Sequence, residues 1–134
     1  MTVSISAVHV IVDDPDAAVA FYSDTLGLTV TNEVARGEFR WITLASDSQP
    51  GIQIVLSQPH AGRSQADGDA IAALLAKGEL RPLHFGTDDL DATFEKIAGA
   101  PGAEVLQEPA TQPWGVRDAA VRDPAGNFLR IEQR

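Results

Sequence analysis

The chain has 134 residues, 44% of them hydrophobic, and a formal net charge of −9, a composition ordinary for one globular domain. The negative charge repels phosphate backbones and anionic lipid surfaces, so nucleic acid and membranes are not expected partners. The chain has no cysteine, which excludes disulfides and thiolate chemistry. No apolar run approaches the roughly 18 residues that cross a bilayer, and no secretory leader is recognisable, so we expect a cytoplasmic protein.

The first half of the chain predicts a β-α-β-β-β unit. Residues 4–12 are rich in β-branched side chains and predict a strand. The sequence Asp13-Asp14-Pro15 is typical of a helix start, and Gly27 is a suitable helix end. Three more strands are predicted at Leu28–Val34, Phe39–Ala45 and Ile52–Ser57.

A linker and a second unit of the same kind follow. The polar residues 58–68 predict the linker, and Asp69–Ala76 predicts a short helix. A strand is then expected at Pro82–Thr87, followed by a helix with Asp88 as its N-cap and a break at Gly99–Gly102. The remaining strands are expected near Ala103–Gln107, Gly115–Arg122 and Phe128–Glu132. We therefore divide the chain into a module at 1–57, a linker with a short helix at 58–80, and a module at 81–134.

The two units are related by an internal repeat. The segment from Val8 to Ala17 returns from Leu83 to Ala92 with five of ten positions identical, at an offset of 75 residues. This period is longer than the units of about 20–50 residues that form solenoids. We therefore predict an α+β fold in which two tandem βαβββ modules form a curved mixed sheet around a cleft.

Successive side chains of a strand point to opposite faces of the sheet, so each strand presents one row of side chains on each face. Apolar rows, such as Val8, Val10 and Val12, are suited to packing beneath the helices. The alternate rows are mixed, and their polar members are expected to converge in one cavity of the kind that binds small molecules. These polar members are His9, Gln53, His84, Arg130 and Glu132.

The first strand and helix, from Asp13-Asp14-Pro15 through Phe21-Tyr22 to Leu26-Gly27, resemble the opening of vicinal oxygen chelate proteins. The closing segment, with Trp114-Gly115 and the turn Asp123–Asn127, resembles their last hairpin. This superfamily contains glyoxalase I, extradiol dioxygenases and bleomycin-resistance proteins. The resemblance covers essentially the whole chain and implies the glyoxalase/bleomycin-resistance fold, a fold that carries many chemistries as well as plain binding.

The resemblance also implies where a divalent metal would be bound. The family's His and carboxylate positions correspond here to four residues that do not match, namely Ala7, Val55 (or Gln53), Pro82 and Arg130. No metal or other cofactor is therefore expected. The alternative is a relocated site made by His9, His84 and Glu132, a composition that suits non-haem iron.

Several side chains are candidate ligand contacts. Aromatic rings could stack on a planar ligand, arginines could hold an anionic group, and neutral histidines could donate or accept hydrogen bonds. Arg130 and Glu132 could equally form a structural ion pair, and the turn residues Asp123 and Asn127 are assigned no chemistry. The candidates are His9, Trp41, Gln53, His84, Trp114, Arg117 and Arg130.

From these features we expect a metal-independent protein that sequesters or carries an apolar or aromatic compound, and the resemblance implies a homodimer whose chains complete each cleft. The main alternative is an enzyme, either a metal-dependent lyase or dioxygenase, or a metal-free isomerase that uses His9 or His84 as general acid or base. A third possibility is an interaction module whose cavity is filled by its own side chains.

Overall fold

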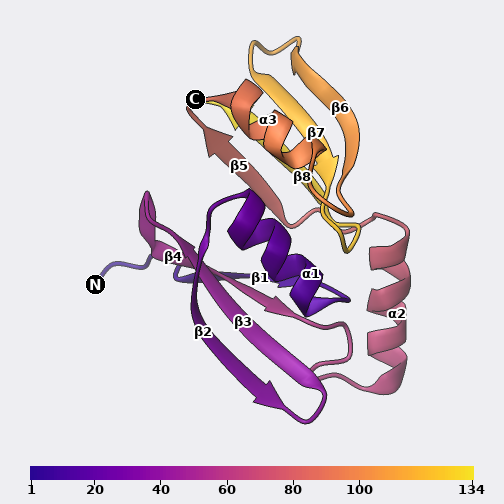
Figure 1. Cartoon of the computed structure of the whole chain (residues 1–134). Helices are drawn as coiled ribbons and strands as arrows, with labels where there is room; N and C mark the ends of the chain where they lie inside the picture. Colours follow the sequence, from indigo (N-terminus) through magenta and orange to yellow (C-terminus); the bar gives the residue numbers. More distant parts are fainter.

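The computed structural model describes all residues from 1 to 134, and it shows one four-stranded mixed sheet in each half of the chain (Figure 1). Sheet A has the strand order β1-β4-β3-β2, and sheet B has the order β5-β8-β7-β6. In each sheet the first strand pairs in parallel with the last, and the other pairs are antiparallel. The strands are β1 (Ala7–Ile11), β2 (Thr29–Arg36), β3 (Phe39–Ser46), β4 (Gln49–Ser57), β5 (Leu83–Thr87), β6 (Glu104–Thr111), β7 (Arg117–Arg122) and β8 (Phe128–Gln133).

The helices begin where the sequence provides caps. In the first half, α1 (Pro15–Val19) continues into the π-helical segment η1 (Ala20–Thr25), and the Asp14 side chain accepts from the amides of Asp16 and Ala17. This helix start confirms the prediction. The sequence predicted one continuous helix here and did not predict the π-helical segment.

Two predicted helix starts differ from the structure. The helix α2 (Gln65–Ala76) begins before Asp69, because the Ser64 hydroxyl accepts from the Asp67 amide and caps it. The helix α3 (Leu90–Ala98) is capped by Asp89, which accepts from the Ala92 amide, so the assignment of this role to Asp88 was wrong. Asp89 is the residue that the 75-residue offset pairs with Asp14. No helix is long and apolar enough to span a membrane.

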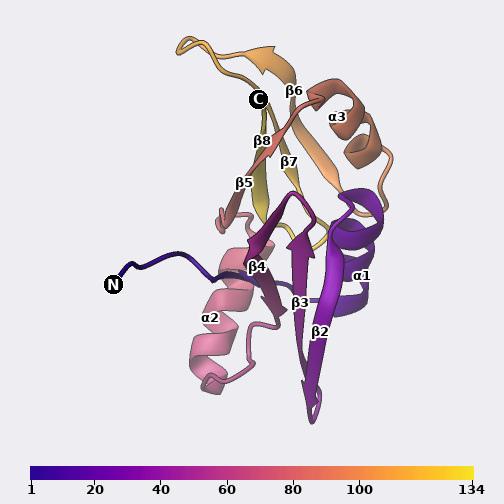
Figure 2. The same ribbon diagram turned by 90° about the vertical axis from the view of Figure 1, so that its left-hand side faces the viewer.

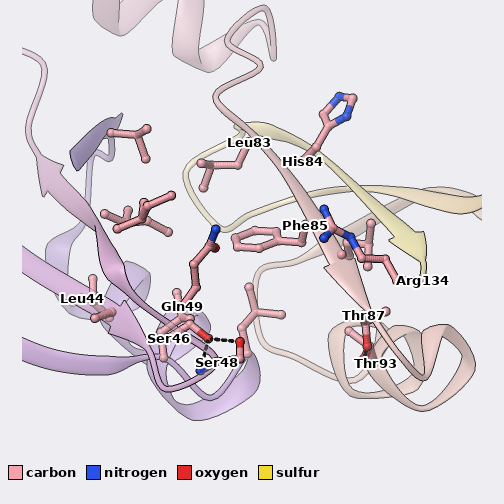
Figure 3. A pocket seen from close by; sticks show the side chains of 18 of the residues that line it. Leu44, Ser46, Ser48, Gln49, Leu83, His84, Phe85, Thr87, Thr93 and Arg134 are labelled. Atoms are coloured by element: carbon pink, nitrogen blue, oxygen red, sulfur yellow. Dashed lines mark hydrogen bonds between the residues drawn. The ribbon is translucent and has the colours of Figure 1, made fainter. Parts of the chain in front are cut away.

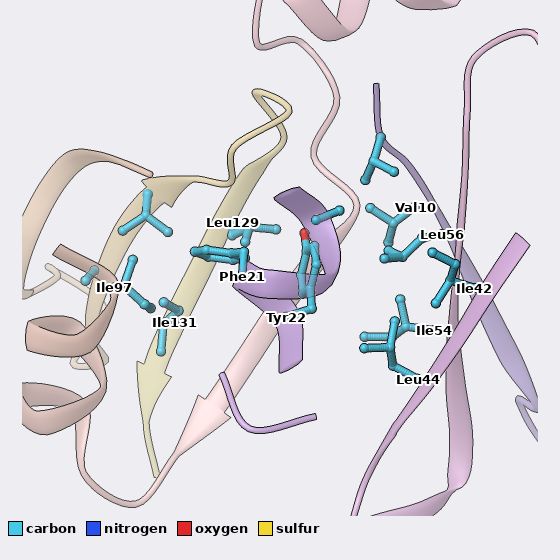
Figure 4. Close-up of a cluster of buried hydrophobic side chains, with 14 of the residues drawn as sticks. Val10, Phe21, Tyr22, Ile42, Leu44, Ile54, Leu56, Ile97, Leu129 and Ile131 are labelled. Atoms are coloured by element: carbon cyan, nitrogen blue, oxygen red, sulfur yellow. The ribbon is translucent and has the colours of Figure 1, made fainter. Parts of the chain in front are cut away.

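One hydrophobic core is shared by the two sheets. The inner rows, which include Val10 and Leu56 of sheet A and Leu129 and Ile131 of sheet B, are almost completely buried in the same cluster. Side chains of η1 lie between the sheets, with Phe21 toward Leu129 and Ile131 and Tyr22 toward Leu56 (Figure 4). The apolar rows therefore pack against the helices, as predicted.

The other rows lie on the outer face of each sheet. β1 and β5 are edge strands, because each is hydrogen-bonded to only one neighbour within the chain. Residues 1–6 precede β1; the Ser6 carbonyl still accepts from the Gln53 amide of β4, and the residues before it extend away from the sheets (Figure 2). Their apolar members Met1, Val3 and Ile5 are exposed.

Candidate functional site

A pocket with a volume of about 850 Å³ lies between the two halves of the chain and is the main candidate for a ligand site. Hydrophobic residues make up 10 of its 19 lining residues. Leu44 from sheet A faces Leu83 and Phe85 of the edge strand β5 across this space (Figure 3). We call it the inter-module pocket. Its size and apolar lining are typical of small-molecule sites.

The polar groups of the inter-module pocket come mainly from its rim. The hydroxyls of Ser46 and Ser48 lie 2.8 Å apart, and those of Thr87 and Thr93 lie 3.0 Å apart. Each pair is thus already hydrogen-bonded. Gln49 differs, because its amide reaches toward Phe85 (Figure 3) and forms no hydrogen bond within the chain. The Gln49 amide is therefore one of the polar groups of this pocket that are free to contact a ligand.

The predicted cavity residues are divided between two faces. His9, Gln53 and Trp41 lie on the outer face of sheet A, because the residues alternating with them, such as Val10 and Ile42, are buried in the core. His84, Arg130 and Glu132 lie on the outer face of sheet B, where Leu129 and Ile131 point inward. Since the inner faces pack on a shared core, the outer faces point apart. Their convergence in one cavity of a single chain was a wrong prediction, and of these residues only His84 lines the inter-module pocket.

Two further candidates lie elsewhere. Trp114, in the turn between β6 and β7, is 68% exposed. Arg117 points to the helix side of sheet B, where its Nη2 donates to Asp91 Oδ1 of α3 at 2.8 Å. Arg117 and Arg130 therefore lie on opposite faces of the sheet and cannot hold the same ligand group.

A buried carboxylate organises the outer face of sheet B. Asp118 of β7 is 3% exposed and accepts hydrogen bonds from Gln107, from Gln112 and, at 3.2 Å, from Nη1 of Arg130. Burial acts to raise the pKa of Asp118, but the hydrogen bonds and the Arg130 charge outweigh it and hold the pKa below the ordinary value. Asp118 therefore stays anionic and anchors Arg130.

The ion pair between Arg130 and Glu132, which the sequence left open as an alternative, is not formed. The ion-pair partner of Arg130 is Asp118, and Glu132 instead lies 3.9 Å from the Arg134 guanidinium. Asp118 is not among the site residues predicted from the sequence. The signal available in the sequence was its place in the same period-two row as Ala120 and Arg122.

The residues at the metal positions implied by the resemblance do not fit a divalent cation. Ala7, Val55 and Pro82 have no side-chain donor, and Arg130 brings a guanidinium that is bonded to Asp118. His9 lies on a different sheet from His84 and Glu132, and no three His, Asp or Glu side chains of the chain are grouped so that they could hold a metal ion.

The fold and the pocket define a two-module α+β protein with a small-molecule-sized cleft between its halves. Residues 4–131 match the model of the Glyoxalase/Bleomycin resistance protein/Dioxygenase superfamily, and the chain belongs to this family. It is 31% identical to the uncharacterized protein YurT of Bacillus subtilis, over 93% of this chain and 94% of YurT.

Two solved structures extend this relationship. The crystal structure of UcmS2 is similar with a TM-score of 0.87 and 30% identity, and the match covers 100% of both chains. The structure of TnmS3, an antibiotic binding protein from Streptomyces, is similar with a TM-score of 0.74 and 27% identity, over 99% of this chain and 98% of TnmS3.

Proposed function

We propose that this protein binds an apolar or aromatic small molecule without a metal ion, and that it sequesters or carries the compound. The observation that carries the proposal is the inter-module pocket of about 850 Å³, with its apolar lining and the free Gln49 amide. Concave, mostly apolar sites with a few polar groups are the usual form of small-molecule sites. The similarity to TnmS3, which is described as an antibiotic binding protein, supports the same function.

We further propose a cytoplasmic homodimer in which each ligand site receives residues from both chains. The free edges of β1 and β5 support this proposal, because such edges usually pair with another strand or are covered. Candidate contacts such as His9 and Trp41 lie outside the inter-module pocket of their own chain, so they would reach a ligand there only from a partner chain. Sedimentation equilibrium measures the assembly directly, and a monomer at all concentrations would contradict it.

A thermal-shift screen against aromatic compounds tests the binding function. We expect stabilising compounds whose effect is lost in Ser48→Trp, because the indole would fill the rim of the inter-module pocket. Asp47→Trp is the matched control, since Asp47 adjoins Ser48 but does not line the pocket. If no compound stabilises the protein, or if both variants behave alike, the pocket is not the binding site.

Metal analysis tests the metal-independent part of the proposal. We expect protein purified without chelator to contain no stoichiometric Fe, Ni, Mn or Zn, and ligand stabilisation to persist after dialysis against EDTA. A metal that is lost in His84→Ala and restores binding when added back would contradict this and favour the relocated site of His9, His84 and Glu132.

The alternative is a metal-free isomerase that uses His84, a lining residue of the inter-module pocket whose imidazole points away from Leu83 and Phe85 and would have to turn toward the compound (Figure 3). A histidine beside a bound compound can act as general acid or base. Mass and chromatographic analysis of compounds recovered after incubation separates the two functions. A binding protein returns the compound unchanged, whereas an isomerase converts it at a rate that His84→Gln abolishes.

A further inference from the structure

Two guanidinium groups lie over the same aromatic ring, that of Phe128 at the start of β8. The Cζ atom of Arg81 lies 4.6 Å from the centroid of the Phe128 ring, and that of Arg130 lies 5.4 Å from it. Both distances are within the range of about 6 Å at which a cation interacts with a ring face. We call these three residues the Arg–Phe cluster. None of the three lines the inter-module pocket.

The ion pair with Asp118 fixes the position of the Arg130 guanidinium. Its Nη1 donates to the buried Asp118, which is itself fixed by hydrogen bonds from Gln112 at 2.8 Å and Gln107 at 3.2 Å. The Nε and Nη2 groups of Arg130 donate no hydrogen bond within the chain. One edge of this guanidinium is therefore anchored, while the other donors are free for a ligand.

Arg81 has no partner that neutralises its charge. It is exposed and forms no ion pair and no hydrogen bond through its side chain, whereas Arg122 nearby is paired with Glu104. Glu132, on the same strand as Arg130, has Arg134 as its partner. Two guanidinium groups, each with one positive charge, lie over the Phe128 ring, and Asp118 compensates only the charge of Arg130. A local positive charge therefore remains in a chain whose net charge is −9.

We propose that the Arg–Phe cluster is a second binding site, which takes an anionic aromatic compound such as an aryl carboxylate. The free donors of Arg130 and the unpaired Arg81 would hold the oxyanion, because planar guanidinium groups match carboxylates geometrically. The aryl ring would stack on the guanidinium planes or against Phe128. Asp118 acts as a positioning residue, since it orients Arg130 without contacting the ligand.

Calorimetric titration with 2-naphthoate and 2-naphthamide tests this proposal, because the two probes have similar shapes and differ in charge. For the unmodified protein we expect 2-naphthoate to bind at least about tenfold more tightly than 2-naphthamide. Arg81→Gln should remove most of this preference and leave the weak binding of 2-naphthamide unchanged. Arg81→Lys should retain an intermediate preference, because it keeps the charge but not the planar donor pattern.

Two control variants locate the effect. Arg36→Gln removes another exposed arginine that has no ion pair, so it should leave the preference intact. Ser48→Trp should also leave 2-naphthoate binding intact, because Ser48 belongs to the inter-module pocket. Equal affinities of the two probes, no binding of either, an equal loss in Arg36→Gln, or a loss in Ser48→Trp would each overturn the proposal. None of these results overturns the binding function of the inter-module pocket, which the separate screen decides.

Discussion

The phenol of Tyr22 donates a hydrogen bond of 2.6 Å to Oδ2 of Asp123, and both side chains are buried. Tyr22 belongs to η1 in the first half, whereas Asp123 belongs to the turn between β7 and β8 in the second. Asp123 also accepts from the backbone and side-chain amides of Asn127, whose side chain donates to the Ile11 carbonyl at 2.7 Å. A buried polar network therefore connects the two modules within their shared core.

We expect Tyr22→Phe to lower the free energy of unfolding by about 1–3 kcal/mol, because it removes one donor from a buried carboxylate. Urea unfolding measures the loss. A double-mutant cycle with Asp123→Asn should give a coupling energy of about 1 kcal/mol or more between the two positions. A Tyr22→Phe protein within about 0.5 kcal/mol of the unmodified one would show that the hydrogen bond contributes little.

Tyr22 also predicts a pH dependence. Burial, followed by the charge and the hydrogen bond of Asp123, raises the pKa of the Tyr22 phenol well above its ordinary value of 10.0. The unfolded chain loses this proton near pH 10, whereas the folded protein keeps it. Stability linked to Tyr22 is therefore complete below pH 10 and is lost as the pH rises above it.

The ultraviolet absorbance of phenolate measures this titration directly, because Tyr22 is the chain's only tyrosine. We expect the phenolate signal to appear together with loss of the circular dichroism of the folded protein, and to appear near pH 10 in urea. A native protein that ionises near pH 10 without unfolding would contradict the raised pKa.

The helix caps give a matched pair of variants. Asp14→Ala and Asp89→Ala should each lower the free energy of unfolding by about 1 kcal/mol, because each removes the acceptor of an orphan helix amide. Asp88→Ala is the control, since its side chain makes no hydrogen bond, and it should change stability by less than about 0.5 kcal/mol. Thermal and urea unfolding compare the three, and a larger loss in Asp88→Ala than in Asp89→Ala would contradict the capping assignment.

Two glycines related by the repeat should respond differently to alanine. Gly126 has φ +105°, and an added Cβ would lie 2.8 Å from the carbonyl oxygen of Leu75 at the end of α2. Its counterpart Gly51 has no neighbour within 4 Å of such a Cβ. We expect Gly126→Ala to cost about 2 kcal/mol or more and Gly51→Ala less than about 0.5 kcal/mol, measured by urea unfolding. Similar losses would show that the turn at Gly126 can shift.

Local and repeated features of the fold could be predicted from the sequence. Strand alternation identified Val10 and Val12 as core residues, and Asp14 was correctly placed at a helix start. The 75-residue offset predicts Asp89 as the second cap, although local inspection favoured Asp88. These features depend on neighbours a few residues away, so the sequence is sufficient to predict them.

Buried polar residues could not be recognised in the same way. Asp123 and Asn127 are ordinary turn residues in the sequence, and Asp118 is one of 19 acidic residues. Each is buried only because partners such as Tyr22, Ile11 and Arg130 approach it from distant parts of the chain. A polar side chain is stable inside a protein when such partners satisfy it, and these partners are known only after folding.

The sequence by itself determined the two-module α+β architecture, the core-facing rows and the family resemblance, because these follow from periodicity, turn chemistry and the repeat. Only the tertiary structure decided which polar residues meet. The two sheets pack their inner faces on a common core, and this turns His9 and His84 away from each other. The same packing leaves a pocket between the modules beside β5 and leaves Arg81 and Arg130 together on the outer face of sheet B.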